Sequence, residues 1–149
     1  MTSRDLAVWG ALLVAAANGI AGLFGLARWY LRQPSREFWF GVRFGQALAL
    51  AYAVVVGALV LADRPPSDSL FYVYALVPIA VGFVAEQLRI VAADHVLTSR
   101  DIEETREVAA LPAAEQQEIV LSIVRREMGV MALAAVVVCV LALRAAGTY

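Results

Sequence analysis

Residues 78–95 read PIAVGFVAEQLRIVAADH, and this stretch predicts the place where the chain leaves a membrane. It begins as an apolar run that suits lipid and ends at Asp94 and His95, which suit water. Between these ends it carries Glu86 and Arg89 to a depth where ionised side chains are costly and need partners. We therefore expect any site inside the membrane to lie around these residues.

The composition of the whole chain is that of a membrane protein. Of the 149 residues, 62% are hydrophobic and 17% are charged, whereas soluble domains contain about 45–50% apolar and about 25% charged residues. The mean hydropathy is +0.74. Because a helical span needs about 20 apolar residues, four spans with short loops nearly fill the chain. We expect a single domain that covers residues 1–149.

Four apolar runs separated by turn residues predict an all-α protein with four transmembrane helices in a bundle. Pro34 and the Pro65–Pro66 pair bound the second run, and proline ends helices. A charged, amphipathic segment precedes the fourth run and predicts a cytoplasmic helical excursion between the third and fourth spans. The expected spans are about residues 6–30, 38–62, 70–93 and 127–145, and the expected cytoplasmic segment is about residues 95–126.

Small residues predict how the spans pack, because helices in lipid associate through close approach of their backbones. The second span contains a ladder of small residues at four-residue spacing, namely Gly41, Gly45, Ala49, Ala53 and Gly57. This ladder predicts that the second span is the most tightly packed. It also offers a face for self-association or for membrane-protein partners.

The first span has a similar series, with Ala11, Ala15 and Gly19 four residues apart. Asn18 lies next to this groove, near the middle of the span. An amide at that depth needs a hydrogen-bond partner, so Asn18 is expected to bond across helices rather than to hold a ligand.

The distribution of arginine predicts the orientation. All 12 basic residues are arginine, a bias that indicates a GC-rich bacterial coding sequence and hence a bacterial plasma membrane. Nine of them lie in residues 28–43 and 89–126, and the other three are Arg4, Arg64 and Arg144. Because cytoplasmic loops carry the excess of basic residues, both termini are expected outside.

Six polar residues from three spans are expected at one depth, near the cytoplasmic boundary. They are Arg43, Gln46, Glu86, Arg89, Arg126 and Glu127. One interpretation is an ion-pair cluster that fixes the register of the helices. The other is a site for an anionic headgroup, or a proton path with Glu86 as carrier. Neighbouring arginines favour the ionised form of Glu86, which argues against easy proton exchange.

Motifs for catalysis, metals and cofactors are missing from the sequence. His95 is the only histidine, so neither a bis-histidine haem nor the paired Glu-x-x-His motif of di-iron bundles is available. Cys139 is the only cysteine, which excludes a Cys-x-x-Cys pair. Ser99 and Ser122 lack a Gly-x-Ser-x-Gly context. We therefore predict no catalytic, metal-binding or cofactor-binding residue, and the net charge of −1 predicts no nucleic-acid partner.

Two segments, VAEQLRI (84–90) and RREMGVMALAA (125–135), resemble a group of actinobacterial four-span integral membrane proteins. The resemblance extends over as much as the whole chain and implies the four-span fold. That group has no assigned activity, so the resemblance implies no substrate, cofactor or site residue.

These observations predict a small structural or accessory protein whose main partner is the lipid bilayer. The alternative is a transporter-like module, or one that binds lipid or a small ligand, using the polar cluster at the cytoplasmic end of the bundle. A membrane enzyme is the third possibility.

Overall fold

A computed structural model describes residues 2–63, 68–100 and 105–148, and within them the chain is helical and contains no strand. The helices are α1 (Ser3–Tyr30), α2 (Arg36–Leu61), α3 (Leu70–Thr98), α4 (Thr105–Ala110) and α5 (Ala113–Thr148). All of these except α4 are long and apolar enough to cross a membrane. The prediction of an all-α chain with four long apolar helices is confirmed.

Side-chain caps fix where the first two helices begin. At α1, the Thr2 hydroxyl accepts a hydrogen bond from the backbone N–H of Asp5 at 3.1 Å, and the Asp5 carboxylate accepts one from the N–H of Thr2 at 2.8 Å. This reciprocal capping box satisfies two of the backbone donors at the helix start. At α2, the buried Ser35 hydroxyl accepts from the N–H of Phe38 at 3.2 Å and starts the helix after the turn.

The end of α1 has an unusual residue in a common motif. The N–H of Gln33 donates to the carbonyl of Arg28 at 3.0 Å, and the N–H of Arg32 donates to the carbonyl of Trp29 at 3.2 Å. This pair of bonds is the Schellman motif, in which glycine usually occupies the left-handed position. Here that position is held by Arg32, at a φ of 57°, although a side chain in this conformation is energetically unfavourable.

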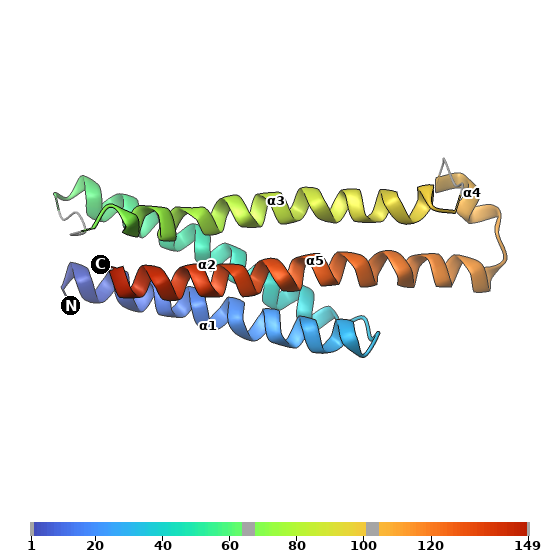
Figure 1. The fold of residues 1–149 in the computed structure, drawn as a ribbon, viewed down its shortest axis with the longest axis horizontal. Coiled ribbons are helices and arrows are strands. Elements are labelled where there is room, and N and C mark those ends of the chain that lie inside the picture. Colours follow the sequence, from blue (N-terminus) through green and yellow to red (C-terminus); the bar gives the residue numbers. More distant parts are fainter. Residues whose placement is uncertain (1, 64–67, 101–104, 149) are drawn as a thin grey trace.

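Helix α5 lies at the centre of the fold. It packs along α1 on one side and along α3 on the other, α1 also packs along α2, and α2 meets α3 only sparsely. In Figure 1, α5 runs between α1 and α3 while α2 crosses them. The two termini lie at the same end (Figure 1), as follows from an even number of long helices that run back and forth.

Buried apolar side chains form two groups along the length of the fold. The group nearer the termini includes Val14, Tyr52, Phe71 and Val138. The group nearer the α1–α2 turn includes Phe38, Val42, Met128 and Met131. Large apolar side chains elsewhere on the four long helices remain exposed on the outside of the protein, as expected for surfaces that contact lipid tails.

The expectation that the second span is the most tightly packed is wrong. In the most apolar 18-residue window of each helix, 39% is buried in α1 and α5, 22% in α2 and 17% in α3. Gly45 and Ala49 are buried, but a Cβ atom added at Gly57 would meet no atom within 4 Å. The reason is geometric: with 3.6 residues per turn, a four-residue ladder drifts about 40° around the helix per step. Its two ends therefore face different surroundings.

Helices α3 and α5 are longer than a membrane is thick. The 36 residues of α5 correspond to about 54 Å at 1.5 Å per residue, compared with a hydrocarbon core of about 30 Å. The amphipathic residues 113–126 and the expected span 127–145 form one continuous helix, and α3 also continues as far as Thr98. Figure 1 shows α3 and α5 projecting together beyond α1 and α2, with α4 at their far end.

Candidate functional site

The carboxylate of Glu86 on α3 is the centre of a polar cluster between α2 and α3. Arg43 donates to its Oε1 atom at 2.5 Å and to Oε2 at 3.4 Å. Gln46 also donates to Oε1, at 3.0 Å. The Nε atom of Arg89 lies 3.5 Å from Oε2, which is an ion pair at a distance too long for a strong hydrogen bond. We call Arg43, Gln46, Glu86 and Arg89 the Glu86 cluster.

Helical spacing assembles the Glu86 cluster. Arg43 and Gln46 are three residues apart and share a face of α2. Arg43 donates a hydrogen bond to the side-chain oxygen of Gln46 at 2.8 Å. Gln46 therefore accepts from Arg43 and donates to Glu86, which fixes the orientation of its amide. On α3, Arg89 follows Glu86 by three residues. The guanidinium carbon of Arg89 lies 5.5 Å from the centroid of the Trp39 ring. This cation–π contact holds Arg89 against the start of α2.

The charges of the Glu86 cluster are only partly withdrawn from the surroundings. The side chains are 52% exposed for Arg43, 25% for Glu86 and 29% for Arg89. Two guanidinium groups and one carboxylate give the cluster a net charge of +1. Donors from both helices converge on the Glu86 carboxylate. This arrangement suits an electrostatic link between α2 and α3 and does not suit the release of a proton by Glu86.

Two of the six expected residues are not joined to this cluster. Arg126 is exposed on α5 and Glu127 is half-buried. Within the described residues, no hydrogen bond or ion pair connects either of them to the Glu86 carboxylate. The sequence indicated their depth along α5 but not the direction that they face.

Asn18 lies between the two apolar groups and links α1 to α2. It is 3% exposed, and its Nδ2 atom donates to the carbonyl of Val14 at 2.9 Å and to that of Gly45 at 3.3 Å. The predicted bond across helices is thereby confirmed. Glycine at position 45 permits this close crossing, because a Cβ atom there would lie 2.7 Å from the side-chain Oδ1 atom of Asn18 and would displace the amide.

A cavity of about 280 Å³ extends from the Glu86 cluster toward Asn18. Arg43, Gln46 and Glu86 line its polar end, and the apolar walls come from α2, α3 and Val138 of α5. The cavity occupies the region where α2 and α3 pack sparsely. The structure thus places three of the predicted site residues at the edge of a partly open space between the helices.

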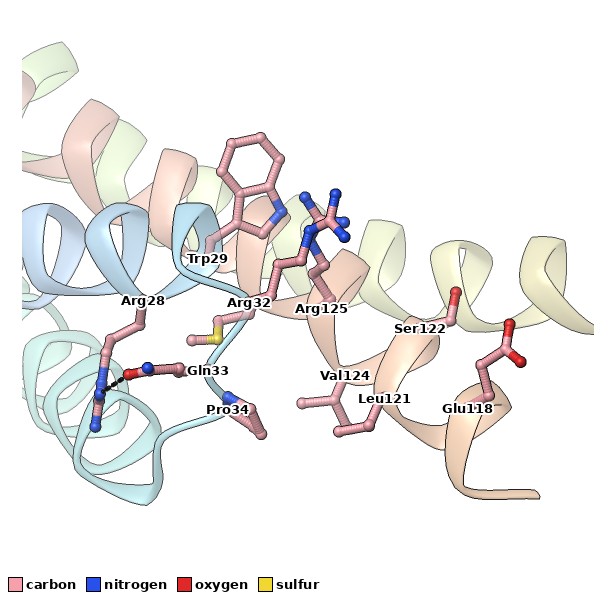
Figure 2. Close-up of a pocket in the computed structure, with 11 residues that line it drawn as sticks. Arg28, Trp29, Arg32, Gln33, Pro34, Glu118, Leu121, Ser122, Val124 and Arg125 are labelled. Atoms are coloured by element: carbon pink, nitrogen blue, oxygen red, sulfur yellow. Dashed lines mark hydrogen bonds between the residues drawn. The ribbon is translucent and has the colours of Figure 1, made fainter. Parts of the chain in front are cut away.

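A second cavity, of about 330 Å³, lies where the α1–α2 turn meets α5. Its charged and polar lining comes from Arg28, Arg32, Gln33, Glu118, Ser122 and Arg125, and the remaining lining residues are Trp29, Pro34, Leu121, Val124 and Met128. We call it the arginine pocket. In Figure 2 the side chains of Arg32 and Arg125 point toward Trp29, whereas Arg28 points to the opposite side and donates to Gln33 at 2.6 Å.

Sequence reasoning missed the arginine pocket. It used Arg28 and Arg32 only for the orientation of the chain and placed Arg125 in the cytoplasmic segment. The one signal for this pocket in the sequence was the surplus of arginine in residues 28–43 and 89–126. What could not be foreseen is that residues more than 90 positions apart in the chain line one space.

His95 and Cys139 line neither of these two cavities. His95 is exposed in the last turn of α3. Cys139 is half-buried in α5, beside Gly19, whose Cβ position is 3.0 Å from the Cys139 sulfur. Within the part of the chain that the structure describes, no group of three or more His, Cys, Asp or Glu residues is placed to hold a metal ion.

Comparison with known proteins adds no assignment to this geometry. No protein-family model, no curated protein and no solved structure matches the chain.

Proposed function

We propose that this protein is a small multi-pass protein of a bacterial plasma membrane with a structural or accessory role, in which the Glu86 cluster holds α2 in register with α3. The observation that carries the proposal is the convergence of Arg43, Gln46 and Arg89 on the Glu86 carboxylate. Fixing register is the best-attested role of buried polar groups. Here it acts between two helices that otherwise touch sparsely.

The proposed orientation has both termini outside and the segment from the end of α3 to the start of α5 in the cytoplasm. The surplus of arginine in residues 28–43 and 89–126 supports it. The position of the two termini at one end of the fold is compatible with it (Figure 1). We also propose membership of the actinobacterial four-span group, which the segments 84–90 and 125–135 support.

An accessory role is supported by how little of α2 and α3 is covered within this chain. Only 22% and 17% of their most apolar windows are buried. In lipid, an apolar helix face is not forced by the hydrophobic effect to pack against another helix. These faces can therefore contact either lipid or the helices of a partner. The proposed partners are the bilayer itself, another membrane protein or a second copy of this chain.

Purification from native membranes tests the accessory role. The tagged chain is cross-linked in intact membranes, extracted in mild detergent and weighed by native mass spectrometry, with an unrelated four-span protein carrying the same tag as control. A partner, or a second copy, at a fixed ratio in the sample and not in the control supports the role. A monomer accompanied only by lipid, with and without cross-linking, contradicts it.

A second function is favoured by the cavity at the Glu86 cluster: a transporter-like or small-ligand-binding module. Its volume of about 280 Å³ is just below the range of about 300–1,000 Å³ for small-molecule sites. Gly82 lines the cavity, and a Cβ atom there would have its nearest neighbour at 4.0 Å. There is room for the Cβ atom of a larger residue at this position, so Gly82→Leu should narrow the cavity.

The Gly82→Leu variant separates the two functions. If the cavity holds a ligand, native mass spectrometry of the wild type shows a bound molecule that the variant lacks. If the cluster only fixes register, the variant folds and associates as the wild type does, and neither protein carries an extra mass. Gly57→Leu, in open space on α2, is the control for adding a leucine.

A further inference from the structure

We propose that the arginine pocket binds an anionic phosphate group, carried either by the headgroup of a membrane lipid or by free phosphate. The pocket is separate from the Glu86 cluster and shares no lining residue with the cavity there. The inference therefore goes beyond the proposed function, and only its lipid form rests on the proposed orientation, which places the pocket on the cytoplasmic side.

The charge of the lining is the first observation. Three arginines and one glutamate line the arginine pocket. The carboxylate of that glutamate, Glu118, accepts a hydrogen bond from Arg100 at 2.8 Å, so its charge is already matched outside the pocket. Arg32 and Arg125 thus have no ion-pair partner among the described residues, whereas Arg28 lies near enough to Glu37 to interact with its charge.

The second observation is the unfilled hydrogen-bonding capacity of these arginines. The Nε atoms of Arg28 and Arg125 are buried, and neither has a hydrogen-bond partner among the described residues. Buried donors without partners are costly, and a phosphate offers several acceptor oxygens that match the fork of a guanidinium group. A phosphate in the pocket would meet the guanidinium groups of Arg32 and Arg125, which point to one side, and not that of Arg28, which points to the opposite side (Figure 2).

The third observation is that Arg125 is held in place. Its guanidinium carbon lies 5.7 Å from the centroid of the Trp29 ring. The indole in turn lies against Gly129, where an added Cβ atom would be 2.8 Å from the indole nitrogen. A cation kept over an aromatic face is pre-positioned, so less conformational entropy is lost when an anion binds.

The backbone at Arg32 is the fourth observation. Arg32 occupies the left-handed position of the Schellman motif, where glycine is the favoured residue. Keeping a long side chain there costs stability, and such costs concentrate at functional sites. In Figure 2 its side chain points to the same side of the pocket as Arg125.

The apolar part of the lining indicates what carries the phosphate. Trp29, Leu121, Val124 and Met128 form walls beside the arginines, so the pocket is amphipathic. Basic pockets between transmembrane helices on the cytoplasmic side commonly bind anionic headgroups. A lipid would place its phosphate at the arginines and its glycerol and first methylenes along these walls, whereas free phosphate would use the arginines alone.

The experiment uses the full-length chain, delipidated in detergent, and native mass spectrometry with short-chain lipids. The probes are dioctanoyl phosphatidylglycerol, which is anionic, and dioctanoyl phosphatidylcholine, which is zwitterionic. Both lipids carry the same phosphodiester, but the choline cation of phosphatidylcholine is repelled by the arginines of the pocket. We therefore expect the anionic lipid to bind at least about tenfold more tightly. Inorganic phosphate alone, followed by thermal melting, is the second arm. Protection of the wild type by phosphate, lost in Arg125→Gln, assigns the site to free phosphate and still supports an anion site.

Matched variants locate the binding. Arg125→Gln should weaken binding of phosphatidylglycerol by roughly tenfold, whereas Arg126→Gln, at the neighbouring exposed position, should not change it. Arg32→Gly should also weaken binding while melting no lower than the wild type, because glycine suits the backbone there. Asp63→Gly relieves a similar backbone, at a φ of 54° after α2, and should leave binding unchanged.

Three outcomes would overturn the proposal. The first is equal binding of the two lipids together with no protection by phosphate. The second is equal loss of binding in Arg125→Gln and Arg126→Gln, which would indicate general surface charge. The third is undiminished binding in a folded Arg32→Gly and Arg125→Gln double variant.

Discussion

At the scale of single residues, Gly45 and Gly57 belong to the same ladder of small residues but differ in how closely they are packed. Gly45 faces the Asn18 amide, with its Cβ position 2.7 Å from the carbonyl oxygen, whereas a Cβ atom at Gly57 meets nothing within 4 Å. We expect Gly45→Leu to lower the free energy of unfolding by about 1–3 kcal/mol, as for overpacking elsewhere. Gly57→Leu should have little effect.

Thermal melting in detergent, or denaturation from mixed micelles, measures this difference between the two glycine variants. Both substitutions add a leucine side chain to α2. Any effect of leucine on the stability of the helix itself is therefore the same in both variants and does not contribute to the difference between them. Equal melting of the two variants would show that the contact between Asn18 and Gly45 is not a packing constraint.

The Glu86 cluster makes a sharper residue-scale prediction. Glu86→Gln should destabilise the protein, and adding Arg43→Gln should recover part of the loss, because the double variant leaves one unmatched guanidinium, that of Arg89, instead of two. We expect a coupling free energy on the order of 1 kcal/mol, since half-exposed Arg43 is partly screened. The coupling with Arg89 should be smaller, because the Arg89 contact is 3.5 Å and the Arg43 contact is 2.5 Å.

A double-mutant cycle on unfolding free energies tests this order. Glu118→Gln is the control, because its ion pair with Arg100 is on the outside and Glu118 is 69% exposed. Exposed pairs contribute about 0–1 kcal/mol, so this control should melt close to the wild type. Strict additivity of Glu86→Gln with both arginine variants would show that the cluster does not fix register.

At the scale of elements, α5 combines two parts that differ in composition. Residues 113–126 are amphipathic and residues 127–145 are apolar, yet one unbroken helix contains both. The first part is held mainly by Ile119, which is 1% exposed, because its ion pair from Arg100 to Glu118 is exposed and contributes little. It should therefore be helical in the protein but easier to open than the apolar part.

Val120→Pro tests this division of α5. Proline removes a helical hydrogen bond at an exposed position, at a cost of about 3 kcal/mol or more. Hydrogen exchange should rise in residues 113–120 and stay low in residues 127–145. Val120→Ala, which keeps the N–H, should leave both rates unchanged. A rise throughout α5 would show that its two parts unfold as one unit.

At the scale of the whole molecule, the two ends of α3 report the orientation. In a Cys139→Ala background, Ser69→Cys and Thr98→Cys place thiols at exposed positions at either end of the helix. With both termini outside, an impermeant maleimide should label Ser69→Cys in intact cells and label Thr98→Cys only after permeabilisation. The reverse pattern would invert the proposed topology.

The Glu86 cluster shows how far sequence reasoning reached. Charge inside an apolar run needs a partner, and depth along each helix follows from the rise per residue. These two rules brought Arg43, Gln46, Glu86 and Arg89 to one level, where the structure joins them. The same rules also included Arg126, because they give the height of a residue and not the direction of its side chain.

Length and hydropathy alone determined that this chain has four helices able to cross a membrane, because each property belongs to a single segment. Only the tertiary structure decided that α5 is central, that the small-residue ladder of α2 packs at Gly45 but not at Gly57, and that Arg125 lines a pocket while Arg126 does not. The reason is rotational. Helical periodicity fixes which residues of one helix share a face, but the rotation of that helix about its axis is set by the side chains of the others.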